Sequence, residues 1–167
     1  MLLSEVLSRI DEHNQMPPDA RPFSTLFGLY HSGEDRCLLL GLKQGCMEEK
    51  VGNQPEALRQ LDVVVLSDLI LEKLLNLSHE RAEKEDLVEY FSDPDDALDV
   101  AVKEGSAASD YEPLIFLMNN TTVAQVKQVA DEGLIMPHKS TYFYPKILTG
   151  MLINKIVPGE KILLPEK

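Results

Sequence analysis

The stretch Pro113–Gly133 reads PLIFLMNNTTVAQVKQVADEG and decides the fold class. Residues 114–118 form a short continuous apolar run, which is typical of a buried β-strand. The polar residues Asn119 to Thr122 then offer cap side chains to a helix that carries three valines at helical spacing on one face. Gly133 ends this helix, because glycine adopts the left-handed conformation of a helix C-terminus without steric cost. A strand followed directly by an amphipathic helix is therefore predicted.

The same alternation extends to both sides of this stretch. Upstream, residues 87–91 are a predicted strand, and Asp93 can cap a helix that begins with Pro94 and ends at Gly105. Downstream, residues 150–156 are predicted to form a final strand. Strands connected through helices favour parallel pairing with right-handed connections.

The N-terminal half is predicted to add a helix, a hairpin and a longer helical region. Residues 2–13 show helical periodicity, and residues 23–31 and 36–43 are predicted to pair across a turn at 32–35. Helical spacing resumes at 56–77, with a break near Asp62 before three β-branched valines. Asp62 is either a buried polar group or a helix cap, and capping is the favoured interpretation.

These elements predict one α+β domain over residues 1–167. Its mixed sheet of about five strands would combine the N-terminal hairpin with the C-terminal strand–helix–strand–helix–strand unit. Residues 157–167 are predicted to be a loose tail.

Composition excludes several classes of partner. The 167 residues carry a net charge of −12, with 44% apolar and 26% charged residues, as in ordinary globular domains. An acidic pI of about 4.7 argues against binding nucleic acid or an anionic membrane. The longest continuous apolar run is 114–118, far short of a membrane span. Without a recognisable signal peptide, a cytoplasmic location with reduced Cys37 and Cys46 is expected.

No catalytic residue or cofactor can be identified from motifs. The sequence lacks the glycine-rich phosphate loops and the nucleophile elbow. Its four histidines show no zinc-ligand spacing, so no metal site is expected. The acidic run at 83–99 is interpreted as a solvated face with helix caps.

The loop between 134 and 147 is unusual, because it is long and rich in hydroxyl and cationic side chains. Residues 134–167 carry a charge of +3, whereas residues 1–133 carry −15. Lysine and hydroxyl groups suit an anion, although simple packing of this loop on the core is the alternative. The candidate anion-binding residues are Lys139, Ser140, Thr141, Tyr142, Tyr144 and Lys146. Secondary candidates, at a strand end that precedes a helix, are Asn119, Asn120 and Thr121.

Residues 136–146 read MPHKSTYFYPK, which resembles the signature of a bacterial and archaeal family, the domain-of-unknown-function family numbered 1015. Residues 27–30, 61–72 and 114–130 also look like parts of that family. His138 and Asn120 stand where the family more often has proline. Only the C-terminal part of the family is matched.

The resemblance implies a context for the chain. Full-length members look like two-part proteins, whose N-terminal part is similar to ParB and sulfiredoxin domains. That part carries an Asp-Gly-His-His-Arg type motif, as free-serine kinases do, and the present sequence lacks this motif. The favoured hypothesis is a non-catalytic accessory domain that packs against such a ParB-like domain, in the same chain or another. The alternative is an anion site in the 136–146 loop that contributes to small-molecule phosphoryl chemistry. A second copy of the chain is another candidate partner.

Overall fold

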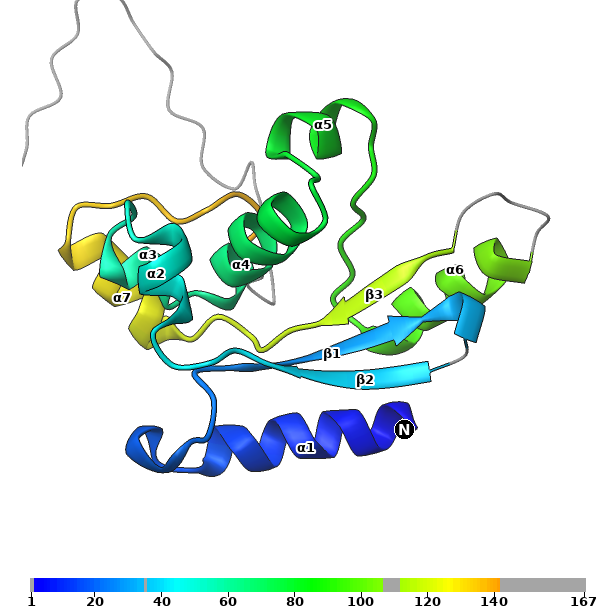
Figure 1. Ribbon diagram of the computed structural model, residues 1–167, viewed down its shortest axis with the longest axis horizontal. Coiled ribbons are helices and arrows are strands. Elements are labelled where there is room, and N and C mark those ends of the chain that lie inside the picture. Colours follow the sequence, from blue (N-terminus) through cyan, green and yellow to red (C-terminus); the bar gives the residue numbers. More distant parts are fainter. Residues whose placement is uncertain (1, 35, 107–111, 142–167) are drawn as a thin grey trace, which may run out of the picture.

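The computed structural model describes residues 2–34, 36–106 and 112–141, and within them the fold centres on an antiparallel sheet (Figure 1). The strands are β1 (Leu26–His31), β2 (Arg36–Gly41) and β3 (Leu114–Leu117), in the order β2-β1-β3. Gly28, in the central strand, pairs with Leu39 on one side and with Leu117 on the other. The predicted hairpin and the predicted strand at 114–118 are therefore confirmed.

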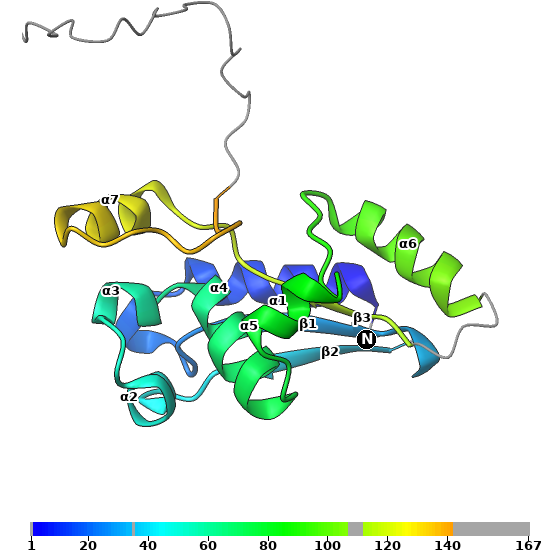
Figure 2. The same cartoon turned by 90° about the horizontal axis from the view of Figure 1, so that it is seen from above.

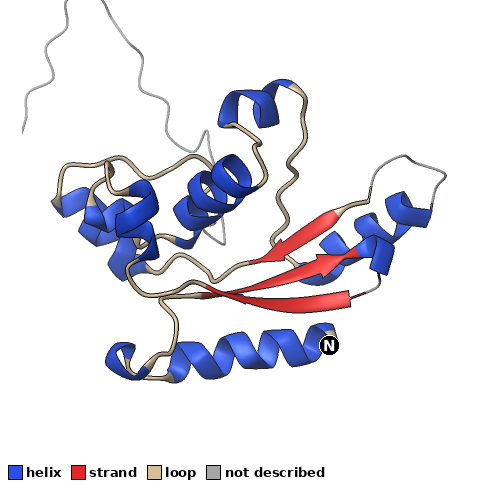
Figure 3. Cartoon of the chain, in the orientation of Figure 1, coloured by secondary structure: helices blue, strands red, loops and turns tan. Residues whose placement is uncertain are grey.

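The mixed sheet of about five strands is wrong for the described residues, which form three strands that all pair in antiparallel fashion. Residues 87–91 are an extended connection and not a strand (Figure 3). Tyr90 and Leu87 are 56% and 46% exposed there. A short apolar run forms a strand only where it can pair with the edge of a sheet. The sequence pattern alone does not show whether such an edge lies nearby. The strand predicted at 150–156 lies outside the described residues, as does the tail at 157–167.

Helices cover both faces of the sheet. In Figures 1 and 2, α1 lies along one face, whereas α2 to α5 lie on the opposite side. The helices in chain order are α1 (Leu3–Gln15), η1 (Pro18–Ala20), η2 (Ser32–Glu34), α2 (Cys46–Val51), α3 (Glu56–Arg59), α4 (Asp62–Val64), η3 (Val65–Leu74), α5 (His79–Lys84), α6 (Pro94–Ser106) and α7 (Val123–Asp131). The short α4 continues directly into η3, which is a π-helix. None of the helices among the described residues is long and apolar enough to cross a membrane.

Alternation along β1 divides the core into two clusters. Successive side chains of a strand point to opposite faces, so Leu26 and Tyr30 pack with Val6 and Ile10 of α1. Phe27 points the other way, into a cluster with α2, α3, α4, η3 and α7. Gly28 allows α1 to approach closely, because a Cβ atom there would lie 2.7 Å from Val6 Cγ1.

Three of the predicted helix ends in the C-terminal half are confirmed, but α6 continues through Gly105 to Ser106 and does not end at the glycine. Asp93 Oδ1 accepts a hydrogen bond from the backbone N–H of Asp95 at 2.9 Å, and Pro94 begins α6. Thr122 caps α7 through a reciprocal arrangement with Gln125. Gly133 follows with a φ of +68°, the left-handed conformation that favours glycine.

Candidate functional site

A carboxylate, Asp62, lies at the junction of the sheet and the helical layer. It is the first residue of α4, and its Oδ2 atom accepts a hydrogen bond from Thr25 Oγ1 at 3.0 Å. Asn119, which follows β3, donates to the same oxygen from Nδ2 at 2.6 Å and from its backbone N–H at 3.3 Å. The prediction that Asp62 serves as a helix cap is therefore wrong. Its carboxylate instead joins segments that are far apart in the sequence.

Asn119 extends this network to the N-terminal helix. Its Nδ2 atom also lies 3.0 Å from Thr25 Oγ1 and 3.3 Å from the carbonyl oxygen of Leu26. Its Oδ1 atom accepts a hydrogen bond from Asn14 Nδ2 at 2.6 Å. The side chain of this secondary candidate is thus engaged within the protein, where it connects α1, β1, α4 and the turn before α7.

Burial raises the pKa of Asp62, and the hydrogen bonds from Asn119 and Thr25 oppose that rise. The charge of His13 opposes it as well. His13 is only 3% exposed and lies with Nε2 3.1 Å from the carbonyl oxygen of Phe23. Because a carbonyl only accepts, Nε2 carries the proton of this hydrogen bond. Its Nδ1 atom is buried without a partner among the described residues.

The network borders an open hollow. Lys139, Ser140 and Thr141 line this hollow together with Asn119, Asn120 and Thr121. The structure therefore brings the two candidate segments to one side of the molecule, a point that the sequence left open. Tyr142, Tyr144 and Lys146 lie outside the described residues.

A short hydrogen bond joins the two candidate segments. Thr121 Oγ1 donates to the carbonyl oxygen of Ser140 at 2.6 Å, and Ser140 Oγ donates to the carbonyl oxygen of Pro137 at 2.6 Å. Each hydroxyl has one proton, so both protons are used to fix the loop. The exposed Lys139, with a φ of +57°, remains as a cation facing solvent at the end of the hollow.

The rest of the hollow is apolar and acidic. Its exposed large apolar side chains are Leu75, Leu87, Tyr90, Phe91 and Leu114, which are between 39% and 56% exposed. Its carboxylates are Asp11, Glu48, Asp62, Asp86, Glu89, Asp93, Glu104 and Glu112, against the cations Arg21, Arg59 and Lys139. The described lining thus combines exposed apolar groups with an excess of negative charge.

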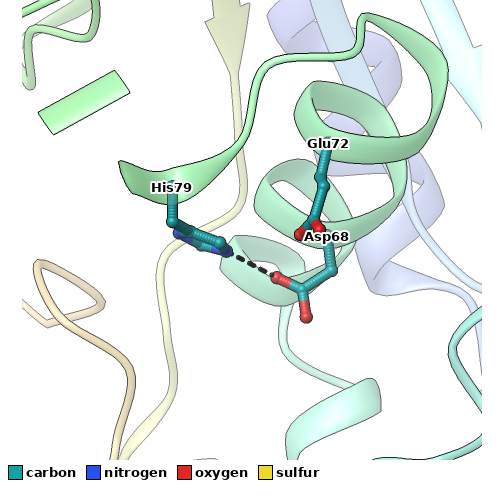
Figure 4. A group of neighbouring side chains, drawn as sticks. All are labelled: Asp68, Glu72 and His79. Carbon is teal, nitrogen blue, oxygen red and sulfur yellow. Dashed lines mark hydrogen bonds and ion pairs between the residues drawn. The ribbon is translucent and has the colours of Figure 1, made fainter. Parts of the chain in front are cut away.

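A second group of polar side chains lies on the helical layer, at η3 and α5 (Figure 4). One ligand atom each from Asp68, Glu72 and His79 lies within 4.8 Å of the other two, a spacing that could hold a metal ion. The sequence analysis missed this group because the three residues match no zinc motif. The sequence did contain one indication of this group: Asp68 and Glu72 are four residues apart, and residues at that spacing share one helix face.

Comparison of the chain with protein-family models, with curated proteins and with solved structures finds no match. The resemblance of residues 136–146 to the domain-of-unknown-function family numbered 1015 stays a prediction.

Proposed function

We propose that this chain is a non-catalytic accessory module that docks another protein domain in the hollow beside Asp62. The observation that carries this proposal is the group of large apolar side chains that line the hollow and remain exposed: Leu75, Leu87, Tyr90, Phe91 and Leu114. Exposed apolar side chains that gather on one surface mark sites of interaction with other proteins.

The lining defines the chemistry of that partner. Aromatic side chains such as Tyr90, which is 56% exposed, are enriched at the centres of protein interfaces, and the exposed leucines add apolar area around it. Eight carboxylates and three cations line the same hollow. The partner is therefore a protein surface with an apolar centre and a basic rim. The family resemblance adds that this partner is a ParB-like domain.

The experiment measures binding between this chain and a ParB-like domain from the same family by isothermal titration calorimetry. Leu87→Lys places a positive charge in the hollow and should weaken binding at least about tenfold, as expected for a residue in an interface centre. Ile135→Lys is the matched control, because Ile135 is 87% exposed and does not line the hollow. Higher salt should also weaken binding, since opposite charges are screened.

Equal affinities of the two variants would contradict the proposed docking surface. Absence of binding by the unaltered chain would contradict the proposed partner. Turnover of a phosphate ester by the chain alone would contradict its non-catalytic role.

An anion site at the Lys139 end of the hollow is the second candidate function. It is favoured by the hydrogen bond from Thr121 to Ser140, which fixes Lys139 beside the turn that precedes α7. Pyrophosphate or phosphoserine should then raise the melting temperature of the chain in a concentration-dependent way. Lys139→Ala should abolish this effect, whereas Lys127→Ala, on α7 and outside the hollow, should retain it.

A further inference from the structure

The group formed by Asp68, Glu72 and His79 combines the elements needed to bind a metal ion. Asp68 and Glu72 lie on η3, and His79 is the first residue of α5. Asn76, with a φ of +54°, lies in the connection that returns the chain toward η3. Figure 4 shows His79 directed toward Asp68, and its Nε2 atom lies 3.1 Å from Asp68 Oδ1.

Asp68 is held in place by neighbours that are not part of the group. Ser67 Oγ donates to Asp68 Oδ1 at 2.6 Å, and Gln54 Nε2 donates to Oδ2. The Asp68 side chain is only 14% exposed, whereas that of His79 is 66% exposed. Hydrogen bonds from neighbouring side chains that orient a ligating carboxylate are typical of metal centres. Asp68 is thus held in a fixed orientation, whereas the exposed side chains of Glu72 and His79 can rotate toward it.

The distances between the three ligand atoms fit tetrahedral coordination of a metal ion after a small rotation of the side chains. Oxygen and nitrogen ligands at about 2.1 Å from zinc lie about 3.4 Å from one another. The Nε2 atom of His79 is already 3.1 Å from Asp68 Oδ1, and all three ligand atoms lie within 4.8 Å. Glu72 and His79 are exposed, so rotation of their side chains can close the remaining distance.

We infer that Asp68, Glu72 and His79 form a binding site for a divalent transition-metal ion, of which zinc is the representative. The imidazole favours zinc over magnesium and calcium, because those ions prefer oxygen ligands throughout. Three protein ligands leave a fourth position for water or for a ligand from another molecule. This site goes beyond the proposed docking function and rests on different residues.

The experiment titrates the full, EDTA-treated chain with zinc chloride and, separately, with magnesium chloride by calorimetry. One zinc ion should bind each chain and raise its melting temperature, since only the folded state brings the three ligands together. His79→Ala and Glu72→Gln should each weaken zinc binding at least about tenfold. Both residues are exposed, so neither substitution should prevent folding.

The matched controls are His138→Ala and Glu80→Gln, which alter exposed residues of the same types outside the group. Both should bind zinc like the unaltered chain. Cobalt in place of zinc should give the visible absorption of a tetrahedral centre in the unaltered chain and lose it in His79→Ala. Zinc binding that is absent, that is unchanged in His79→Ala, or that is matched by magnesium would overturn the inference.

Discussion

Replacement of Asn119 by alanine should destabilise the fold, because this side chain connects four segments. Its Nδ2 atom donates to Asp62 at 2.6 Å and lies 3.3 Å from the carbonyl oxygen of Leu26. A hydrogen bond to a charged group contributes about 1.5–3 kcal/mol, and one between neutral groups contributes about 1 kcal/mol. Asn14, which is exposed, can bond to water instead. The expected loss is therefore about 3 kcal/mol in the free energy of unfolding.

Urea denaturation followed by circular dichroism measures this loss. For a chain of this length, each kcal/mol lowers the melting temperature by about 2–4 °C, so the expected decrease is about 6–12 °C. Asn120→Ala is the matched control, since Asn120 is the next residue and is exposed. Its effect should stay within about 0.5 kcal/mol. A difference below about 1 kcal/mol between the two variants would refute the reasoning.

Three further predictions concern the same framework. Burial raises the pKa of Asp62 above its ordinary value of 3.8, so the folded state holds this proton more tightly than the unfolded state. The free energy of unfolding of the unaltered chain, minus that of the Asp62→Asn variant, should therefore fall as the pH rises from about 3.8 through the raised pKa. If this difference stays constant or increases over the same pH range, the pKa of Asp62 is not raised in the folded state. Gly28→Ala should cost about 1–3 kcal/mol in urea denaturation, because its Cβ would lie 2.7 Å from Val6 Cγ1; unchanged stability would mean that α1 does not approach β1 so closely. Thr121→Val removes the hydrogen bond to Ser140 and should speed hydrogen exchange in residues 134–141, and unchanged exchange would show that this bond does not hold the loop.

Local signals predicted the individual elements better than their pairing. The caps at Asp93 and Thr122 follow from side chains that act on their own backbone, so they could be predicted from the sequence. Strand pairing depends on which edges meet in space. The sequence does not show which edges meet, so residues 87–91 were wrongly predicted to form a strand. In the structure they form an extended connection, on which Leu87, Tyr90 and Phe91 are exposed.

The candidate sites show the same limit. The sequence singled out residues 119–121 and 139–141 separately, and only the fold placed them beside one hollow. The role of Asp62 could not be derived, because its partners Thr25 and Asn119 lie 37 and 57 residues away. Likewise, His79 meets Asp68 only because the chain turns at Asn76.

The position of β3 beside β1 has a consequence for folding. The β1–β2 hairpin closes through a four-residue turn, but roughly 70 residues separate β2 from β3. Closing the longer loop costs about 2.5 kcal/mol more in chain entropy, and contacts of such separation slow folding. The hairpin should therefore form early and the third strand late. Because Asn119 follows that third strand, we expect its hydrogen bonds to Asp62 to form after the hairpin.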